Sequence, residues 1–171
     1  MSQSGPTRVL FVCHANVCRS PLAEGLFRHL VAERGMAGKF RVDGAGVQAM
    51  EGAPPSRYCV EIGQREGFEV GGASRQIHRD DLEQCDHILL MDLSNLERLE
   101  FLARTHGGIG GFPARVRLLL EASGEPPGRQ EVADPIGGPR EGYETMYRQV
   151  RRACEHLLDQ MVAEGARQDE S

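Results

Sequence analysis

The chain has 171 residues, of which 40% are hydrophobic and 26% are charged, and its formal net charge at pH 7 is −5. This length and composition predict one soluble globular domain whose core is large enough to fold without metals or disulfides. The acidic balance argues against a surface built to wrap nucleic acid or to lie on an anionic membrane.

The five cysteines are odd in number, and their spacing suits no disulfide framework. We expect Cys59, Cys85 and Cys154 to be free thiols in a reducing compartment. The sequence contains no Cys-x-x-Cys pair and no histidine at zinc-finger spacing, which argues against a structural metal site. Its longest apolar runs have the length of strands rather than of membrane spans. These features predict a cytoplasmic protein that holds no metal.

Segments typical of strands and of helices alternate along the chain. In chain order we expect a strand over 8–12, a helix that begins at Ser20 and Pro21 and ends at Gly35, a strand from Phe40 to Gly46, a helix from Pro54 to Gly67, a strand over 88–91, a helix over 93–104, a strand over 116–120, a long surface loop over 121–140 and a helix over 146–161. Ser20 is the expected N-cap of the first helix, with Pro21 in its first turn. We expect a single domain over 1–171, with 1–7 and 164–171 as loose tails.

This alternation predicts an α/β fold with a parallel sheet and right-handed crossovers. In such a sheet, ligands bind beyond the C-terminal ends of the strands. Cys13 follows the first strand directly and therefore lies at that end. The long loop over 121–140 is uncommon in a compact domain unless the loop has a function.

A short loop from Cys13 to Arg19 joins the first strand to the first helix. Its backbone N–H groups and the helix N-terminus can converge on one tetrahedral oxyanion, and the same field stabilises a thiolate. Cys13 is therefore the candidate nucleophile, and the planar fork of Arg19 matches two phosphoryl oxygens. Ser20 can donate its hydroxyl hydrogen to the sulfur, and Asn16 suits a left-handed backbone conformation. The pattern predicts a cysteine-dependent phosphatase.

The run Cys13-His14-Ala15-Asn16-Val17-Cys18-Arg19-Ser20-Pro21 resembles the Cys-x-Gly-Asn-x-Cys-Arg-Ser-Pro signature of the low-molecular-weight protein tyrosine phosphatase family. Further landmarks at 41–46, 54–55, 75–77, 91–96 and 134–135 follow in family order, so the resemblance covers residues 8–162. It implies a three-layer domain whose four-stranded parallel sheet has the order 2-1-3-4 and is flanked by helices. It also implies that phosphate binds in the loop after the first strand, at the positions His14, Ala15, Asn16, Val17, Cys18, Arg19 and Ser20.

The same resemblance implies a protein that acts on tyrosine-phosphorylated protein and releases inorganic phosphate. We expect it to be a monomer. The resemblance implies no metal and no organic cofactor, and the acidic charge balance argues against a nucleic-acid or membrane partner.

Breaking the phosphorus–oxygen bond of an aryl phosphate leaves a phenolate, which departs readily only with a proton. The resemblance assigns the proton to Asp134 of Asp134-Pro135, which then serves as base for the water that attacks the phosphocysteine. Pro135 keeps Asp134 out of helical geometry and stiffens its loop. By this resemblance, Cys13, Arg19 and Asp134 are expected to hydrolyse phosphotyrosine through a phosphocysteine intermediate.

Three positions in the loop and its surroundings depart from the family pattern. Ala15 stands at a family glycine and adds a methyl group where the backbone approaches phosphate. Gly44 and Gly72 replace the serine and histidine that brace the loop asparagine in many relatives. We therefore expect fewer side chains to support Asn16.

The aromatic residues that grip a phosphotyrosine ring in the family are missing, which leaves the substrate open. Met50 and Ile136 are the candidate walls of a wider, less selective mouth. The Asp-Pro-x-Gly-Gly run that begins at Asp134 is similar to a bacterial branch that includes protein arginine phosphatases. These carry a threonine at the position of Val17, so Val17 argues against that activity. The related arsenate reductases need two cysteines near the third strand, where this chain has only Cys85.

Two further hypotheses concern the same loop. Cys18 is close enough in sequence to form a reversible disulfide with Cys13, which would protect the nucleophile from over-oxidation, or it simply fills buried space. The altered support of Asn16 also fits a catalytically idle phosphate- or phosphoprotein-binding module. The presence of Cys13, Arg19 and Asp134 together favours an enzyme.

Overall fold

A four-stranded parallel sheet forms the centre of the protein in the computed structural model, which describes residues 5–171. The strands are β1 (Thr7–Cys13), β2 (Phe40–Gly46), β3 (His87–Leu90) and β4 (Arg115–Leu118). They lie in the order β2-β1-β3-β4, and every neighbouring pair is parallel. The predicted α/β fold and strand order are therefore confirmed.

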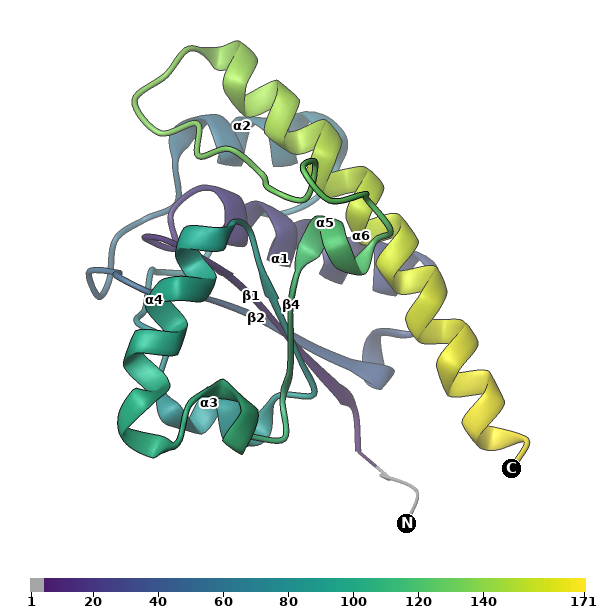
Figure 1. Cartoon of the computed structure of the whole chain (residues 1–171). Coiled ribbons are helices and arrows are strands. Elements are labelled where there is room, and N and C mark those ends of the chain that lie inside the picture. The colour runs from purple at the N-terminus through teal and green to yellow at the C-terminus, as the bar shows by residue number, and fades with distance from the viewer. Residues whose placement is uncertain (1–4) are drawn as a thin grey trace.

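Helices cover both faces of this sheet (Figure 1). They are α1 (Arg19–Glu33), α2 (Arg57–Glu66), α3 (Arg79–Gln84), α4 (Leu93–Ala103), α5 (Leu119–Ala122) and α6 (Arg140–Asp169), and short 3-10 turns lie at Ala37–Lys39, Arg104–His106 and Ile109–Gly111. Helices α1, α2, α5 and α6 lie on one face, and α3 and α4 lie on the other.

The two faces of the sheet have separate hydrophobic cores, because successive side chains of a strand point to opposite sides. From β1, Val9 and Phe11 contribute to the core under α1 and α6, whereas Leu10 and Val12 contribute to the core under α4. All four side chains are almost fully buried. Burial on both faces explains why β1 reads as a continuous apolar run in the sequence.

The sheet register brings several chain segments to the C-terminal edge of the sheet. Cys13 at the end of β1 pairs with Gly46 at the end of β2, and Val12 pairs with Leu90 at the end of β3. The segment after β3 and the N-terminus of α1 therefore meet at the same edge. A site at this edge can draw on residues that are far apart in sequence.

Several element boundaries differ from the sequence-based expectations. Ser20 is not the N-cap of α1: the helix begins at Arg19 and the N-cap is Cys18, because the Ser20 hydroxyl points to the sulfur of Cys13 instead. The fourth strand ends at Leu118, and the residues after it form α5. The long loop accordingly begins after α5, and helix α3 was not expected at all.

The C-terminal residues also differ from expectation. Residues 164–171 were expected to be a loose tail, but α6 continues as far as Asp169. Its last turns are exposed and contain mostly residues with high helix propensity, so the helix extends beyond its apolar stripe. Of the expected N-terminal tail, residues 1–4 lie outside the described part, and Thr7 is already in β1.

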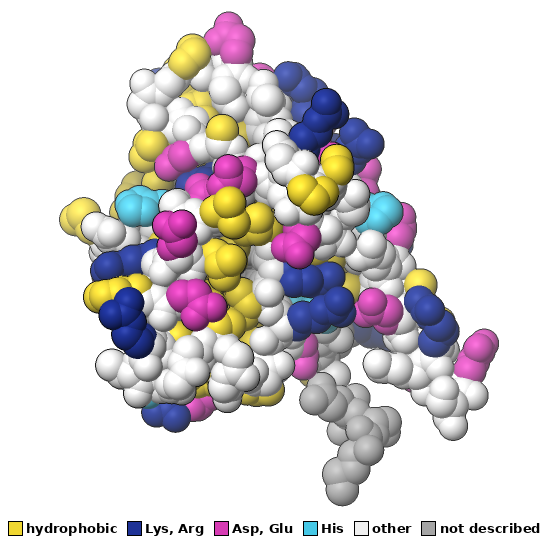
Figure 2. Space-filling model, viewed as in Figure 1, with side chains coloured by type: hydrophobic (Ala, Val, Ile, Leu, Met, Phe, Trp, Pro, Cys, Tyr) yellow, Lys and Arg dark blue, Asp and Glu magenta, His cyan; other side chains and the backbone are white. Residues whose placement is uncertain are grey.

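Positive and negative side chains are interspersed on the face of the molecule shown in Figure 2. Within residues 5–171, no helix is both long and apolar enough to cross a membrane. Nor do these residues bring together three or more side chains that could hold a metal ion.

Candidate active site

Cys13 is the last residue of β1, and its side chain is buried directly in front of the N-terminus of α1. Its sulfur lies 3.1 Å from the hydroxyl oxygen of Ser20. Because a helix N-terminus favours negative charge, this position suits a thiolate. The expected contact between Cys13 and Ser20 is therefore present.

Asn16 adopts the left-handed conformation expected from the sequence, with a φ of 58°. It is the only non-glycine residue of the described chain with a positive φ. Its amide Nδ2 donates to the Ser20 hydroxyl at 2.7 Å, and its Oδ1 accepts from the backbone N–H of Arg75 at 3.1 Å. The residue is 4% exposed, so its side chain supports the loop from inside and is not a surface group.

Arg19 is a buried cation, with only 2% of its side chain exposed. Its Nη1 atom donates to Asp92 Oδ2 at 2.6 Å and to the carbonyl of Val132 at 2.9 Å. Its Nη2 atom lies 3.5 Å from Asp134 Oδ2. Among the described residues nothing accepts a hydrogen bond from its buried Nε. A buried donor without a partner is costly, so an oxyanion beside Cys13 would complete the set of acceptors for Arg19.

Asp92 is the main functional residue that the sequence reasoning did not assign to the site. It follows β3 and caps α4, where its Oδ1 accepts hydrogen bonds from the backbone N–H of Asn95 and the hydroxyl of Ser94. Burial alone would raise the pKa of Asp92, but the hydrogen bonds from Ser94 and Arg19 hold it below its ordinary value. The available signal was its place immediately after a buried strand, at the edge where ligands bind.

Asp134 reaches Arg19 because the loop before it is attached to the sheet. The backbone N–H of Val132 donates to the carbonyl of Met91 at 2.8 Å, and the Val132 side chain is fully buried. Glu131 accepts a hydrogen bond from the backbone N–H of Leu93. Two residues after this anchor, the side chain of Asp134 is 36% exposed and lies beside Arg19, so it can meet a substrate from the solvent side.

Cys18 lies behind the loop rather than at its surface. Its thiol donates a long hydrogen bond to the Tyr143 hydroxyl at 3.9 Å, and Cys59 donates to the carbonyl of Cys18 at 3.5 Å. Interaction with the Cys59 thiol lowers the pKa of Cys18, whereas interaction with the Cys18 thiol, together with burial, raises the pKa of Cys59. The disulfide between Cys13 and Cys18 stays a prediction, and Cys59 is a second thiol beside Cys18 that the sequence did not reveal.

The remaining predicted site residues surround the loop. His14 is exposed, Ala15 and Val17 are half-buried, and their backbone belongs to the loop between β1 and α1. Met50 is 81% exposed and Ile136 is 57% exposed. Both sit on segments tied to the site, since Gln48 donates to the carbonyl of His14 and Ile136 donates to Asp134.

The family model described as low molecular weight phosphotyrosine protein phosphatase matches residues 8–167. The chain belongs to this family. The human low molecular weight phosphotyrosine protein phosphatase is 35% identical over 160 residues, which are 93% of this chain and 98% of the relative. The Bacillus subtilis low molecular weight protein-tyrosine-phosphatase YfkJ is 36% identical over 154 residues, which are 88% and 92% of the two chains. The sequence-based resemblance is therefore confirmed, and the chain is a phosphatase.

Solved structures of this phosphatase family have the same fold. The crystal structure of YfkJ matches with a TM-score of 0.83 at 33% identity and covers 95% of this chain and 99% of its own. The crystal structure of a Drosophila arginine phosphatase matches with a TM-score of 0.81 at 30% identity, over 90% and 96% of the two chains. The fold of the low molecular weight phosphatases thus occurs in proteins named for different phosphorylated residues.

Proposed function

We propose that this phosphatase hydrolyses phosphotyrosine in proteins through a phosphocysteine intermediate. The observation that carries the proposal is the 3.5 Å approach of Asp134 to Arg19, which itself begins the helix behind Cys13. A nucleophile, a cation for the phosphoryl oxygens and a carboxyl group for the leaving oxygen are the three groups that this reaction needs.

In the first step, the Cys13 thiolate attacks phosphorus, and a sulfur–phosphorus bond forms as the bond to the tyrosine oxygen breaks. Asp134 donates its proton to that oxygen, and tyrosine leaves. Arg19 binds two of the equatorial phosphoryl oxygens, and the backbone N–H groups of the loop stabilise the charge that spreads over them. Ser20 donates its hydroxyl hydrogen to the sulfur whenever the sulfur is anionic.

In the second step, Asp134 takes a proton from water as the water oxygen attacks phosphorus. The sulfur–phosphorus bond breaks, inorganic phosphate leaves, and Cys13 returns to the thiolate. Asp134 is protonated again and is ready for the next substrate. One carboxyl group therefore serves as acid and then as base.

Three side chains in and around the Cys13 loop support phosphotyrosine over phosphoarginine as the substrate. Val17 offers no hydroxyl group to the guanidinium of a phosphoarginine. Met50 and Ile136 are exposed apolar side chains that can contact an aryl ring. Neither residue is aromatic, so we expect low selectivity among phosphotyrosine peptides.

The proposal is tested with two peptides of one sequence that carry either phosphotyrosine or phosphoarginine. We expect kcat/KM to be at least about 10-fold higher for phosphotyrosine, and Val17→Thr to shift the ratio toward phosphoarginine. Cys13→Ser abolishes turnover of both, whereas Cys85→Ser, a matched change of a thiol outside the site, does not. A higher kcat/KM for phosphoarginine contradicts the proposed substrate, and full activity of Cys13→Ser contradicts the mechanism. An arsenate arm with a thiol reductant tests reductase activity, for which we expect no turnover.

A further inference from the structure

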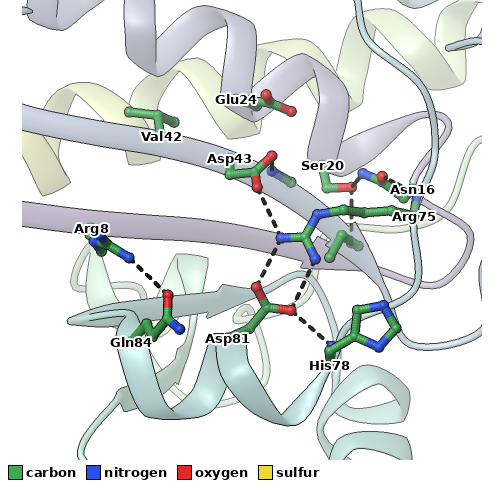
Figure 3. A network of polar contacts seen from close by, with 12 residues as sticks. Arg8, Asn16, Ser20, Glu24, Val42, Asp43, Arg75, His78, Asp81 and Gln84 are labelled. Carbon is green, nitrogen blue, oxygen red and sulfur yellow. Dashed lines mark hydrogen bonds and ion pairs between the residues drawn. The ribbon is translucent and has the colours of Figure 1, made fainter.

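We propose that Arg75 is a positioning residue for the Cys13 loop and acts through Asn16. The inference concerns the proposed catalytic site and rests on the proposed function only for its consequence in catalysis. Its basis is a chain of hydrogen bonds that runs from the backbone of Arg75 through Asn16 and Ser20 to the Cys13 sulfur. Figure 3 shows Arg75 beside Asn16 and Ser20, together with the acidic side chains that hold its guanidinium.

The direction of this chain depends on the backbone N–H of Arg75. An N–H group can only donate, so it must face the Oδ1 of Asn16, and this fixes which way the Asn16 amide points. The Nδ2 of Asn16 then donates to the Ser20 oxygen at 2.7 Å. The Ser20 oxygen is occupied as an acceptor, so its own hydrogen can go to the Cys13 sulfur at 3.1 Å or to the Ala45 carbonyl at 3.4 Å. An anionic sulfur is the nearer and the stronger acceptor of the two. With the amide reversed, the Ser20 hydrogen would point to Asn16, and the thiolate would lose its donor.

The Arg75 side chain helps to hold that backbone N–H in place. Its guanidinium makes two parallel hydrogen bonds to Asp81, at 2.9 and 3.0 Å, and a third to Asp43 at 2.9 Å. Asp43 belongs to β2, and Asp81 belongs to α3, where it also accepts a hydrogen bond from the backbone of His78. Asp81 is the main reason that the pKa of Arg75 is raised, so the guanidinium stays charged. Bidentate pairing gives geometric precision as well as stability.

Within residues 5–171, the Asn16 side chain makes hydrogen bonds only to the Ser20 hydroxyl and the Arg75 backbone, so no side chain on its other side supports it. Gly44 and Gly72 line a cavity of about 150 Å³ together with Asn16, and neither has a side chain to offer. A Cβ atom at Gly44 would lie 3.1 Å from the Asn16 amide nitrogen, so this position is next to the amide. Residues 71–74 have no regular secondary structure, and Gly72 has a φ of 84°. The support of Asn16 that we expected to be weak therefore comes from Arg75.

The segment around Arg75 is also joined to β2 by its backbone. The Arg75 carbonyl accepts from Gly46, and the Gly46 carbonyl accepts from Ile77. These bonds, and the Ser74 carbonyl that accepts from the backbone N–H of Gly52, keep the fold when the guanidinium is removed. The expected change is a small displacement of the Arg75 N–H that weakens its hydrogen bond to Asn16. We therefore expect a change in the reactivity of Cys13 that exceeds the change in stability.

The test uses the rate at which iodoacetamide alkylates Cys13 across pH, because this rate reports the thiolate without requiring turnover. Arg75→Met keeps the aliphatic stem and removes the guanidinium. We expect its alkylation at a given pH to slow by about fivefold, the factor that one hydrogen bond supplies. Arg75→Lys keeps the charge without the bidentate geometry and should recover only part of the rate. Arg79→Ala, which removes an exposed arginine of α3, is the control and should match the unmodified protein.

A double-mutant cycle with Asn16→Ala separates this role from a general effect of charge. If Arg75 acts through Asn16, then Arg75→Met slows alkylation no further once Asn16 is alanine. If instead the two substitutions slow alkylation by factors that multiply, the proposal is overturned, because the Arg75 cation would then act on Cys13 directly and not through Asn16. An Arg75→Met profile that coincides with the Arg79→Ala profile would also overturn it. If Arg75→Met does not fold, Asp81→Asn in the same cycle gives the answer. A failure of phosphotyrosine turnover in the unmodified protein refutes the proposed function and leaves these alkylation results valid.

Discussion

The guanidinium of Arg19 is buried, and its hydrogen-bond partners determine which of its nitrogen atoms can bind phosphoryl oxygens. Burying a cation is costly unless it is paired and hydrogen-bonded. Asp92 and the Val132 carbonyl together occupy Nη1, which leaves Nε and Nη2 for phosphoryl oxygens and for Asp134. Hydrogen bonds keep the pKa of Asp92 below its ordinary value, so its carboxyl group remains ionised at neutral pH. Asp92 both neutralises Arg19 and aims it.

We therefore predict that Asp92→Asn lowers kcat/KM for an aryl phosphate by about 10- to 100-fold. The change replaces a charge-assisted hydrogen bond, which contributes about 1.5–3 kcal/mol, by a neutral one, and 1.36 kcal/mol corresponds to tenfold in rate. Inorganic phosphate should also inhibit the variant less strongly, because the same guanidinium holds it. Steady-state kinetics with phosphate as inhibitor measure both effects.

Asp80→Asn is the matched control, since it changes an exposed carboxylate in the first turn of α3. It should leave both constants unchanged. If phosphate inhibits Asp92→Asn as strongly as it inhibits the unmodified enzyme, then Asp92 does not orient Arg19 toward the phosphoryl oxygens.

At the scale of elements, the loop between α5 and α6 matters because it is anchored on both sides of Asp134. Val132 is bound to the end of β3 and to Arg19, and Pro135 is buried. Asp134 lies between these two anchors with a partly exposed carboxyl group. Its only hydrogen bond within the loop is from the backbone N–H of Ile136 at 3.2 Å. The loop therefore brings a carboxyl group to the site without burying it.

This placement predicts that Asp134→Ala changes how the rate depends on the leaving group. For phenyl phosphate or phosphotyrosine, kcat/KM should fall by about 10²- to 10⁴-fold, the usual contribution of a general acid. For a dinitrophenyl phosphate the fall should be much smaller, because that phenolate leaves without a proton. A series of aryl phosphates gives the dependence as a slope against the leaving-group pKa. Glu141→Gln, an exposed carboxylate at the start of α6, serves as control. Equal losses for good and poor leaving groups would exclude Asp134 as the acid.

The parts of the site that the sequence predicts are those made within one short stretch of chain. Cys13, Asn16, Arg19 and Ser20 lie in one strand–loop–helix unit, whose chemistry is visible in residue types and spacing. The contact of Arg19 with Asp92 joins residues 73 positions apart, and its contact with Val132 uses a backbone carbonyl that carries no side-chain signal. Such contacts exist only once the strands are aligned in the sheet.

The same reason explains which elements were missed. Helix α3 has six residues and one buried side chain, Leu82, so it has no apolar period to recognise. It is specified instead by the capping box between His78 and Asp81. Helix α5 follows β4 without a break, and its leucines at 119 and 120 are as apolar as a strand. Local patterns therefore located long elements well and short ones poorly.

At the scale of the whole molecule, the two ends of the sheet differ in what they contribute, one to catalysis and the other to stability. The C-terminal ends of the strands carry the site, whereas the other end includes His87, the first residue of β3. His87 is flanked by Asp86, by Arg115 and Arg117 of β4, and by Glu164 of α6. Burial, followed by the charge of Arg117, lowers the pKa of His87 below its ordinary value of 6.5, and its Nδ1 has no hydrogen-bond partner within residues 5–171.

This arrangement predicts that the protein loses stability on mild acidification for a reason unrelated to catalysis. Below pH 6.5 the unfolded chain takes up the histidine proton more readily than the folded one. The contribution of neutral His87 to the free energy of unfolding is therefore fully present above pH 6.5, and it is lost as the pH falls through the lower pKa that His87 has in the folded protein.

Urea unfolding on either side of pH 6.5 should show this loss in the unmodified protein and a smaller loss in His87→Leu. His106→Gln changes an exposed histidine and should keep the full loss. Equal pH dependence of His87→Leu and the unmodified protein would mean that other groups govern acid stability. The fall in stability should leave the leaving-group dependence set by Asp134 unchanged in the folded enzyme, because His87 and the Cys13 loop lie at opposite ends of the strands.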